Sequence, residues 1–123
     1  MELMTTLVDV VVPGDPVPAP RPRVGQGRVY MPKRAVEARE RLQGFLLQDL
    51  VKRHSPRRYE GPVRVDLWFS VLRAGDLDNY AKQVLDALND LVLKDDRQVV
   101  DLHARLVAGS PTGVHVVVET TGV

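Results

Sequence analysis

Residues 75–98 combine a dense group of carboxylates with a lysine. Asp76 and Asp78 flank one leucine, and Asp86, Asp95 and Asp96 follow within the same stretch. Oxygen ligands without histidine or cysteine favour a hard cation such as Mg²⁺, with Mn²⁺ as a substitute. Such an ion keeps several waters and can accept phosphate oxygens, so phosphodiester chemistry is one of its several possible uses.

The spacing predicts where these side chains lie on a helix. A helix advances about 100° per residue, so Asp78, Lys82, Asp86 and Asn89 fall within an arc of about 80°. This arc lies opposite the apolar face, and a lysine there suits stabilisation of transition-state charge or positioning of water. If the strand after Asp96 lies beside the strand that ends near Leu72, Asp95 and Asp96 return to the same end of the sheet as Asp76.

Structural roles account for each motif taken separately. Asp78 or Asn79 suits the cap of the helix, and Lys82 suits an i,i+4 ion pair with Asp78 or Asp86. Asp95 and Asp96 suit an ordinary turn. Capping explains one aspartate and leaves the crowding of the others unexplained.

The surrounding pattern predicts the elements that position these residues. It predicts strands at 5–12, 63–72, 98–107 and 114–120, helices at 33–54 and after residue 79, and a short strand or hairpin arm around Gly25 and Gly27. Prolines make 13–23 an extended, stiff loop. We expect residues 63–72 to form a central strand covered on both faces, with Trp68 and Phe69 in the core, and 108–113 to be a hairpin loop. The order is β-β-α-β-α-β-β, a single α+β domain over 1–123 with helices packed on a mixed sheet.

Bulk composition excludes several classes of protein. The formal net charge is +1 and there is no cysteine, so there is no disulfide framework or thiolate metal site, which fits a cytoplasmic location. No apolar run is long enough to cross a bilayer, and the N-terminus does not resemble a signal peptide. Residues 21–58 hold eleven Lys or Arg, whereas residues 66–101 hold eight Asp. The split indicates a polyanion partner and a cation site, or two solvated faces of opposite sign.

The stretch GDLDNYAKQVLDALNDLVLKDDRQVVD (residues 75–101) resembles the signature region of the RusA-type Holliday-junction resolvases of bacteria, phages and prophages. The matching pattern is D-x-D-N, then lysine, then D-x-L, then D-D-x-Q. The segments PGDPVPAPRPR and GRVYMP resemble the family's N-terminal region, so the likeness covers nearly the whole chain.

This resemblance implies a homodimer that binds four-way DNA junctions and makes paired, symmetric nicks with a divalent metal, in recombination and repair. It assigns catalysis to Asp76, Asp78, Asp96 and Lys82, with the three aspartates as metal ligands. Asp95, Asp86 and Asn79 are candidates for further metal ligands or for residues that orient the ligands. A two-fold enzyme suits a nearly two-fold junction.

Basic residues near the N-terminus are candidates for phosphate contacts, or else an ordinary basic surface. They are Arg21, Arg23, Arg28, Lys33 and Arg34. One alternative function is a DNA-binding protein that keeps the scaffold without cutting. A phosphoesterase or transferase acting on small nucleotides lacks support, because no G-x-x-x-x-G-K loop is present.

Overall fold

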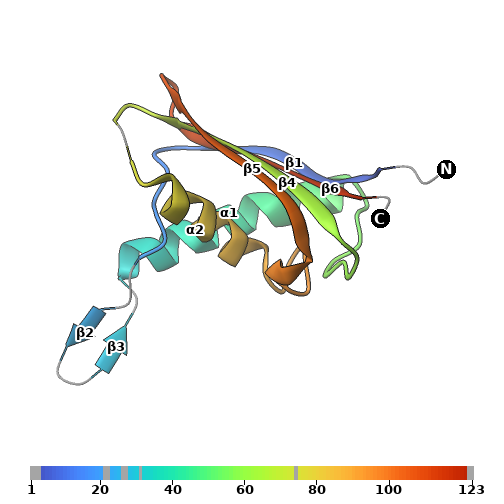
Figure 1. Ribbon diagram of the computed structural model, residues 1–123, viewed down its shortest axis with the longest axis horizontal. Helices are drawn as coiled ribbons and strands as arrows, with labels where there is room; N and C mark the ends of the chain where they lie inside the picture. The colour runs from blue at the N-terminus through green and yellow to red at the C-terminus, as the bar shows by residue number, and fades with distance from the viewer. Residues whose placement is uncertain (1–3, 21–22, 26–27, 31, 74, 122–123) are drawn as a thin grey trace.

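The computed structural model describes residues 4–20, 23–25, 28–30, 32–73 and 75–121. In these residues a four-stranded mixed sheet has the order β1-β6-β4-β5, and two helices lie on one of its faces (Figure 1). The strands are β1 (Thr6–Pro13), β4 (Val63–Val71), β5 (Val99–Ala108) and β6 (Gly113–Thr120), and the helices are α1 (Lys33–Lys52) and α2 (Leu77–Leu88). The predicted α+β class, with helices packed on a mixed sheet, is confirmed.

The short hairpin near the N-terminus contains two strands, so the chain has one more strand than predicted. β2 (Arg23–Gly25) and β3 (Arg28–Tyr30) pair antiparallel and extend from the start of α1, away from the sheet (Figure 1). Between β1 and this hairpin, residues 15–20 follow an extended path, as their prolines predict. No helix in the described ranges is both long and apolar enough to span a membrane.

Side chains of β4 point alternately to the two faces of the sheet, and one set of them forms the centre of the core. The odd-numbered residues of the strand, from Val63 to Val71, are buried beneath the helices. Leu42, Leu46 and Leu50 of α1 pack against them, whereas Val36 lies on the exposed side of that helix. Burial of a leucine or phenylalanine side chain stabilises a fold by roughly 1.5–3 kcal/mol, so this layer is the main source of stability.

The prediction that β4 is covered on both faces is wrong. Its even-numbered residues point to the other face of the sheet, where Trp68 is only half-buried and Asp66 is buried between Arg64 and Arg105. Trp68 stacks on His115 of β6 and contacts Arg105 of β5. Trp68 is therefore not a core residue, while Phe69 is. An apolar run does not reveal which face is covered, because the cover comes from distant elements.

The predicted hairpin between the last two strands is also wrong. β5 and β6 do not pair with each other, because β4 lies between them. β4 pairs parallel with β5 and antiparallel with β6. Residues 109–112 therefore cross over the end of β4, where Gly109 N–H donates to Val71 O at 3.1 Å. A turn-rich loop of this length fits either a hairpin or a crossing over one strand, and the sequence does not distinguish them.

A single 3₁₀ turn, η1 (Asp96–Gln98), leads into β5 and carries the D-D-x-Q motif. Gln98 is its anchor: its amide nitrogen donates to Tyr59 O at 2.6 Å and to Gly61 O at 2.8 Å. Its amide oxygen accepts from Asp95 N–H at 2.8 Å. The glutamine therefore fixes the turn that holds Asp96 against the 59–61 loop.

We expect Gln98→Ala to lower the free energy of unfolding by about 1–3 kcal/mol, because partly buried backbone groups lose their partners. Chemical denaturation monitored by circular dichroism measures this change. Arg97→Ala is the matched control on the same turn, since the Arg97 side chain is 89% exposed and its ion pair with Asp95 lies in solvent. Equal effects of the two substitutions would contradict the anchoring role of Gln98.

Candidate active site

Asp76 is the N-cap of α2, which corrects the prediction that Asp78 or Asn79 fills this role. Its carboxylate accepts from Asn79 N–H at 3.4 Å and from the Asn79 side-chain amide at 2.6 Å. Asn79 thereby orients the Asp76 carboxylate. The helix begins at Leu77, two residues earlier than an Asp78 cap requires, so Asp76 and Asp78 both lie at the helix N-terminus, where negative charge is favourable.

Asp78 and Lys82 lie exposed on the first two turns of α2, one turn apart. Asp86 continues the same stripe but points toward α1, where its carboxylate pairs with Arg39 at 3.5 Å. Asn89 follows as the C-cap of the helix. The polar edge predicted from helix geometry is therefore present, and its first half is the part left open to a ligand.

Asp95 and Asp96 have different local roles. The Asp95 carboxylate closes a capping box with Gln98 and accepts from Arg97 N–H at 2.9 Å. This backbone hydrogen bond is the largest cause that holds the pKa of Asp95 below its ordinary value. Asp96 follows as the first residue of η1 and has no ion pair with a cationic side chain in the described part of the chain.

The structure contradicts the predicted meeting of Asp76 with Asp95 and Asp96. β5 does lie beside β4, but the two strands are parallel, and Val63 at the start of β4 is level with Val99 at the start of β5. Asp96 therefore lies at the end of the sheet where β4 and β5 begin, whereas Asp76 lies just beyond the opposite end, where β4 stops. α2 separates them, and its twelve residues span about 18 Å.

This separation decides what one chain can bind. Magnesium needs its oxygen ligands at about 2.0–2.1 Å, so carboxylates at opposite ends of α2 cannot share one ion. Across the described residues, no three His, Cys, Asp or Glu side chains lie close enough to hold a metal. Asp76 and Asp78 supply a pair of carboxylates of the right chemistry at the end of the molecule where α2 begins.

A hollow of about 420 Å³ lies where β4 ends and α2 begins. Arg34 and Arg73 line it together with Asp15 and Tyr80. Tyr80 packs directly over Gly75, where an added Cβ would overlap the tyrosine ring, and it stacks on Phe69. Arg34 is one of the basic residues predicted from the sequence to contact phosphate, whereas Arg73 and Tyr80 are not among the predicted site residues. Their place in the sequence could have identified them, because Arg73 shortly precedes the D-x-D-N motif and Tyr80 directly follows it.

The remaining basic candidates lie toward the same end of the molecule. Lys33 is exposed at the start of α1 and forms a surface ion pair with Glu37 at 3.7 Å. Arg23 lies in β2 and Arg28 in β3, in the hairpin that extends from that end (Figure 1). Arg21 lies outside the described residues.

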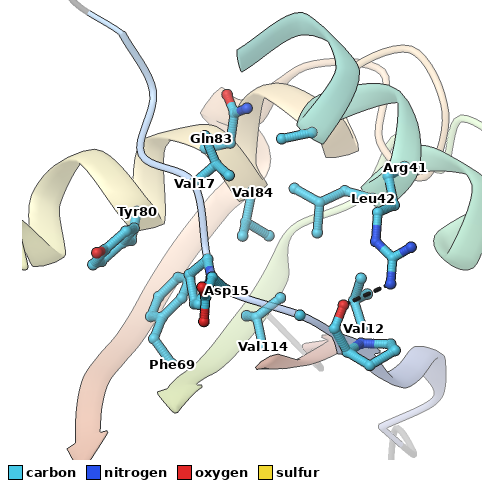
Figure 2. Close-up of a pocket in the computed structure, with 14 residues that line it drawn as sticks. Val12, Asp15, Val17, Arg41, Leu42, Phe69, Tyr80, Gln83, Val84 and Val114 are labelled. Carbon is cyan, nitrogen blue, oxygen red and sulfur yellow. Dashed lines mark hydrogen bonds between the residues drawn. The ribbon is translucent and has the colours of Figure 1, made fainter. Parts of the chain in front are cut away.

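A second cavity, of about 200 Å³, lies beneath the proline-rich segment between α1, α2 and the sheet (Figure 2). Its walls are mainly apolar, with Val17, Leu42 and Val84 among them. Arg41 at its rim donates to Pro13 O, and further along the segment Ala19 N–H donates to Asn79 O at 2.8 Å. The segment is thus fastened to the first turn of α2, and the cavity itself has no group of carboxylates.

Comparison with known proteins identifies the family of this chain. The sequence matches the family described as endodeoxyribonuclease RusA over residues 13–119, which is most of the chain. It is also similar to the uncharacterized protein YqaN of Bacillus subtilis (strain 168), with 70% identity over 27 residues. That match spans 22% of this chain and only 19% of the length of YqaN, so it is a local likeness. The family match covers α2, β4 and β5 completely and β6 up to residue 119. The chain therefore belongs to the RusA family of endodeoxyribonucleases.

Proposed function

We propose that this protein resolves four-way DNA junctions as a Mg²⁺-dependent homodimer that makes paired, symmetric nicks, in DNA recombination and repair. Membership of the RusA family supports a junction-resolving endodeoxyribonuclease in general. The observation that carries the finer proposal is the paired carboxylates at the start of α2, with Lys82 one turn further on and Arg34 and Arg73 lining the adjacent hollow.

Each group has a role that follows from its chemistry. Asp76 and Asp78 would hold the cation, which supplies Lewis acidity toward a phosphate oxygen and lowers the pKa of a bound water. Lys82 is exposed and places its ammonium beside the charge that develops on the phosphate. Asn79 keeps the Asp76 carboxylate oriented through its 2.6 Å hydrogen bond. Arg34 and Arg73 would contact the DNA backbone, which contributes affinity with little sequence information.

The position of Asp96 leads to a proposal about the dimer. Asp96 lies at the wrong end of its own chain to join Asp76 and Asp78, and Asp95 is engaged in the capping box. A two-fold axis exchanges equivalent ends of two chains. We therefore propose that each active site combines Asp76 and Asp78 of one protomer with Asp96 of the other.

Asp76→Asn and Asp96→Asn should each lower junction cleavage in Mg²⁺ on the order of 10²-fold or more, by analogy with the loss of one charge-stabilising group. Asparagine caps a helix about as well as aspartate does, and Asp96 makes no capping contact, so the fold and junction binding should persist in both variants. Strand-specific nicking of a labelled synthetic junction, with and without Mg²⁺, measures cleavage, and a gel-shift assay without metal measures binding. Asp90→Asn, at an exposed site paired with Arg58, is the control. Wild-type protein that binds the junction but never cuts it would favour the non-cleaving alternative.

Mixed dimers test the composite site. Dimers that join an Asp76→Asn chain to an Asp96→Asn chain keep one intact site, formed by the unmutated halves. Random mixing should restore about a quarter of wild-type nicking, mostly as single nicks, because about half of the dimers are mixed and each has one active site. A mixture of Asp76→Asn with Asp78→Asn should stay inactive, since both residues belong to the same half-site. Equal recovery in both mixtures, or none in either, would refute the composite site.

Arg34→Ala and Arg73→Ala should each weaken junction binding by roughly threefold to tenfold at moderate salt. Each should also reduce the slope of log K against log salt by about 0.9, the loss of one phosphate contact. Fluorescence anisotropy over a range of NaCl concentrations measures both quantities. Lys52→Ala at the far end of α1 is the matched control and should change neither. Equal losses for all three variants would indicate a diffuse basic surface in place of a binding site at this end.

A further inference from the structure

We propose that Gln83 is a positioning residue that fastens the β2–β3 hairpin to α2, so that DNA held by the hairpin reaches the metal site in a fixed register. The inference rests on the proposed function for the roles of Asp76, Asp78 and Lys82. It adds a residue to which that function gives no role, and a physical link between DNA binding and cleavage.

Gln83 is a buried amide on the side of α2 that faces α1, and it is only 1% exposed. Its side-chain nitrogen donates to Ala35 O, in the first turn of α1, at 2.8 Å. Ala35 is itself buried, so this hydrogen bond is shielded from water and is electrostatically stronger than an exposed one. The contact therefore holds the start of α1 against the second turn of α2.

Stability alone does not account for a glutamine at this place. The Gln83 Oε1 atom is buried and meets no hydrogen-bond donor among the described residues, and an unpaired buried acceptor costs stability. Ala35 O does not depend on the glutamine, because within α1 it also accepts from the backbone N–H four residues further on. A methionine of similar length would fill the same space without an unpaired atom. We infer that the amide serves to fix the position of α1 on α2.

Both ends of the hairpin segment are attached to α2. Before the hairpin, Ala19 N–H donates to Asn79 O at 2.8 Å, and after it, Ala35 O accepts from Gln83. Asn79 and Gln83 are four residues apart, so the two attachments lie on the same side of α2, about 6 Å apart along its axis. The hairpin that extends from this end of the molecule (Figure 1) is therefore held by α2 at both of its ends.

The two attachment residues adjoin the groups proposed for catalysis. Asn79 also donates its side-chain amide to the Asp76 carboxylate at 2.6 Å, and Gln83 directly follows Lys82. Loosening the hairpin would shift bound DNA relative to these groups, and a misplacement of about 1 Å can lower a rate on the order of 10²-fold. Gln83 thus links the place where the hairpin binds DNA to the place where the metal site cuts it.

Gln83→Met should separate positioning from folding. The substitution removes the amide donor and the unpaired oxygen together, so the denaturation midpoint should equal or exceed that of the wild type. Junction affinity should stay within about twofold, since the phosphate contacts remain. The single-turnover rate of nicking at saturating protein in Mg²⁺ should fall by about tenfold or more. The nicks should also spread over neighbouring phosphodiester bonds, because the bound DNA is no longer held in one register.

Gln43→Met is the matched control. Gln43 makes the same kind of contact in the opposite direction, from its side-chain amide on α1 to Ala87 O near the end of α2, at 3.5 Å. It lies about two turns further along α1 than Ala35, so this variant should match the wild type in midpoint, affinity, rate and cut position. Equal losses of cleavage in the two variants would overturn the positioning role of Gln83. So would a Gln83→Met protein that cleaves normally, or one whose stability, binding and cleavage fall together.

Hydrogen exchange gives a readout that needs no nuclease activity. In protein without DNA or metal, peptides that contain Ala19 and the first turn of α1 should exchange about threefold faster or more in Gln83→Met, and at the wild-type rate in Gln43→Met. Faster exchange together with a wild type that never cuts a junction would refute the proposed function alone. Wild-type cleavage together with unchanged exchange and an unchanged nicking rate in Gln83→Met would refute the inference alone.

Discussion

Parallel pairing of β4 with β5 is the constraint on which the arrangement of the molecule depends. Two parallel neighbours require the chain to return along the whole length of the sheet between them, and α2 makes that return. The return places Asp76 where β4 ends and Asp96 where β5 begins. The same crossing lays α2 over β4, which buries Val84 and Leu88 against the core and turns Asp78 and Lys82 outward. Core formation and the distribution of the acidic residues therefore have one cause.

Structural and chemical roles coincide in the D-x-D-N and D-D-x-Q motifs. Asp76 caps α2 and presents a carboxylate that Asn79 holds in place, while Asp95 and Gln98 cap and anchor η1 so that Asp96 has a defined position. In each motif one aspartate completes a cap and the other has no capping contact. Capping therefore accounts for one aspartate of each motif and leaves Asp78 and Asp96 without a structural role, while Asp76 combines its capping role with a carboxylate open to a ligand.

The open face of the sheet shows how polar groups can occupy a central strand. Asp66 is 6% exposed, and Arg64 and Arg105 pair with it from β4 and β5. Arg105 also lies over the ring of Trp68, 4.5 Å from its centre. These contacts satisfy the buried carboxylate and shield the tryptophan, so the face can remain uncovered by helices without an isolated buried charge.

Most of the elements, the fold class and the residue types of the site follow from local sequence, because hydrophobic periodicity, proline and capping residues act over a few neighbours. It predicted α1 and the three long strands after it nearly to their ends, and the arc of Asp78, Lys82 and Asp86 follows from helix geometry alone. Three features came from the packing of distant segments: β4 separates β5 from β6, Trp68 lies on an open face, and Asp96 is distant from Asp76. Strand order and direction depend on which distant surfaces bury each other, and the spacing of neighbouring residues does not predict this.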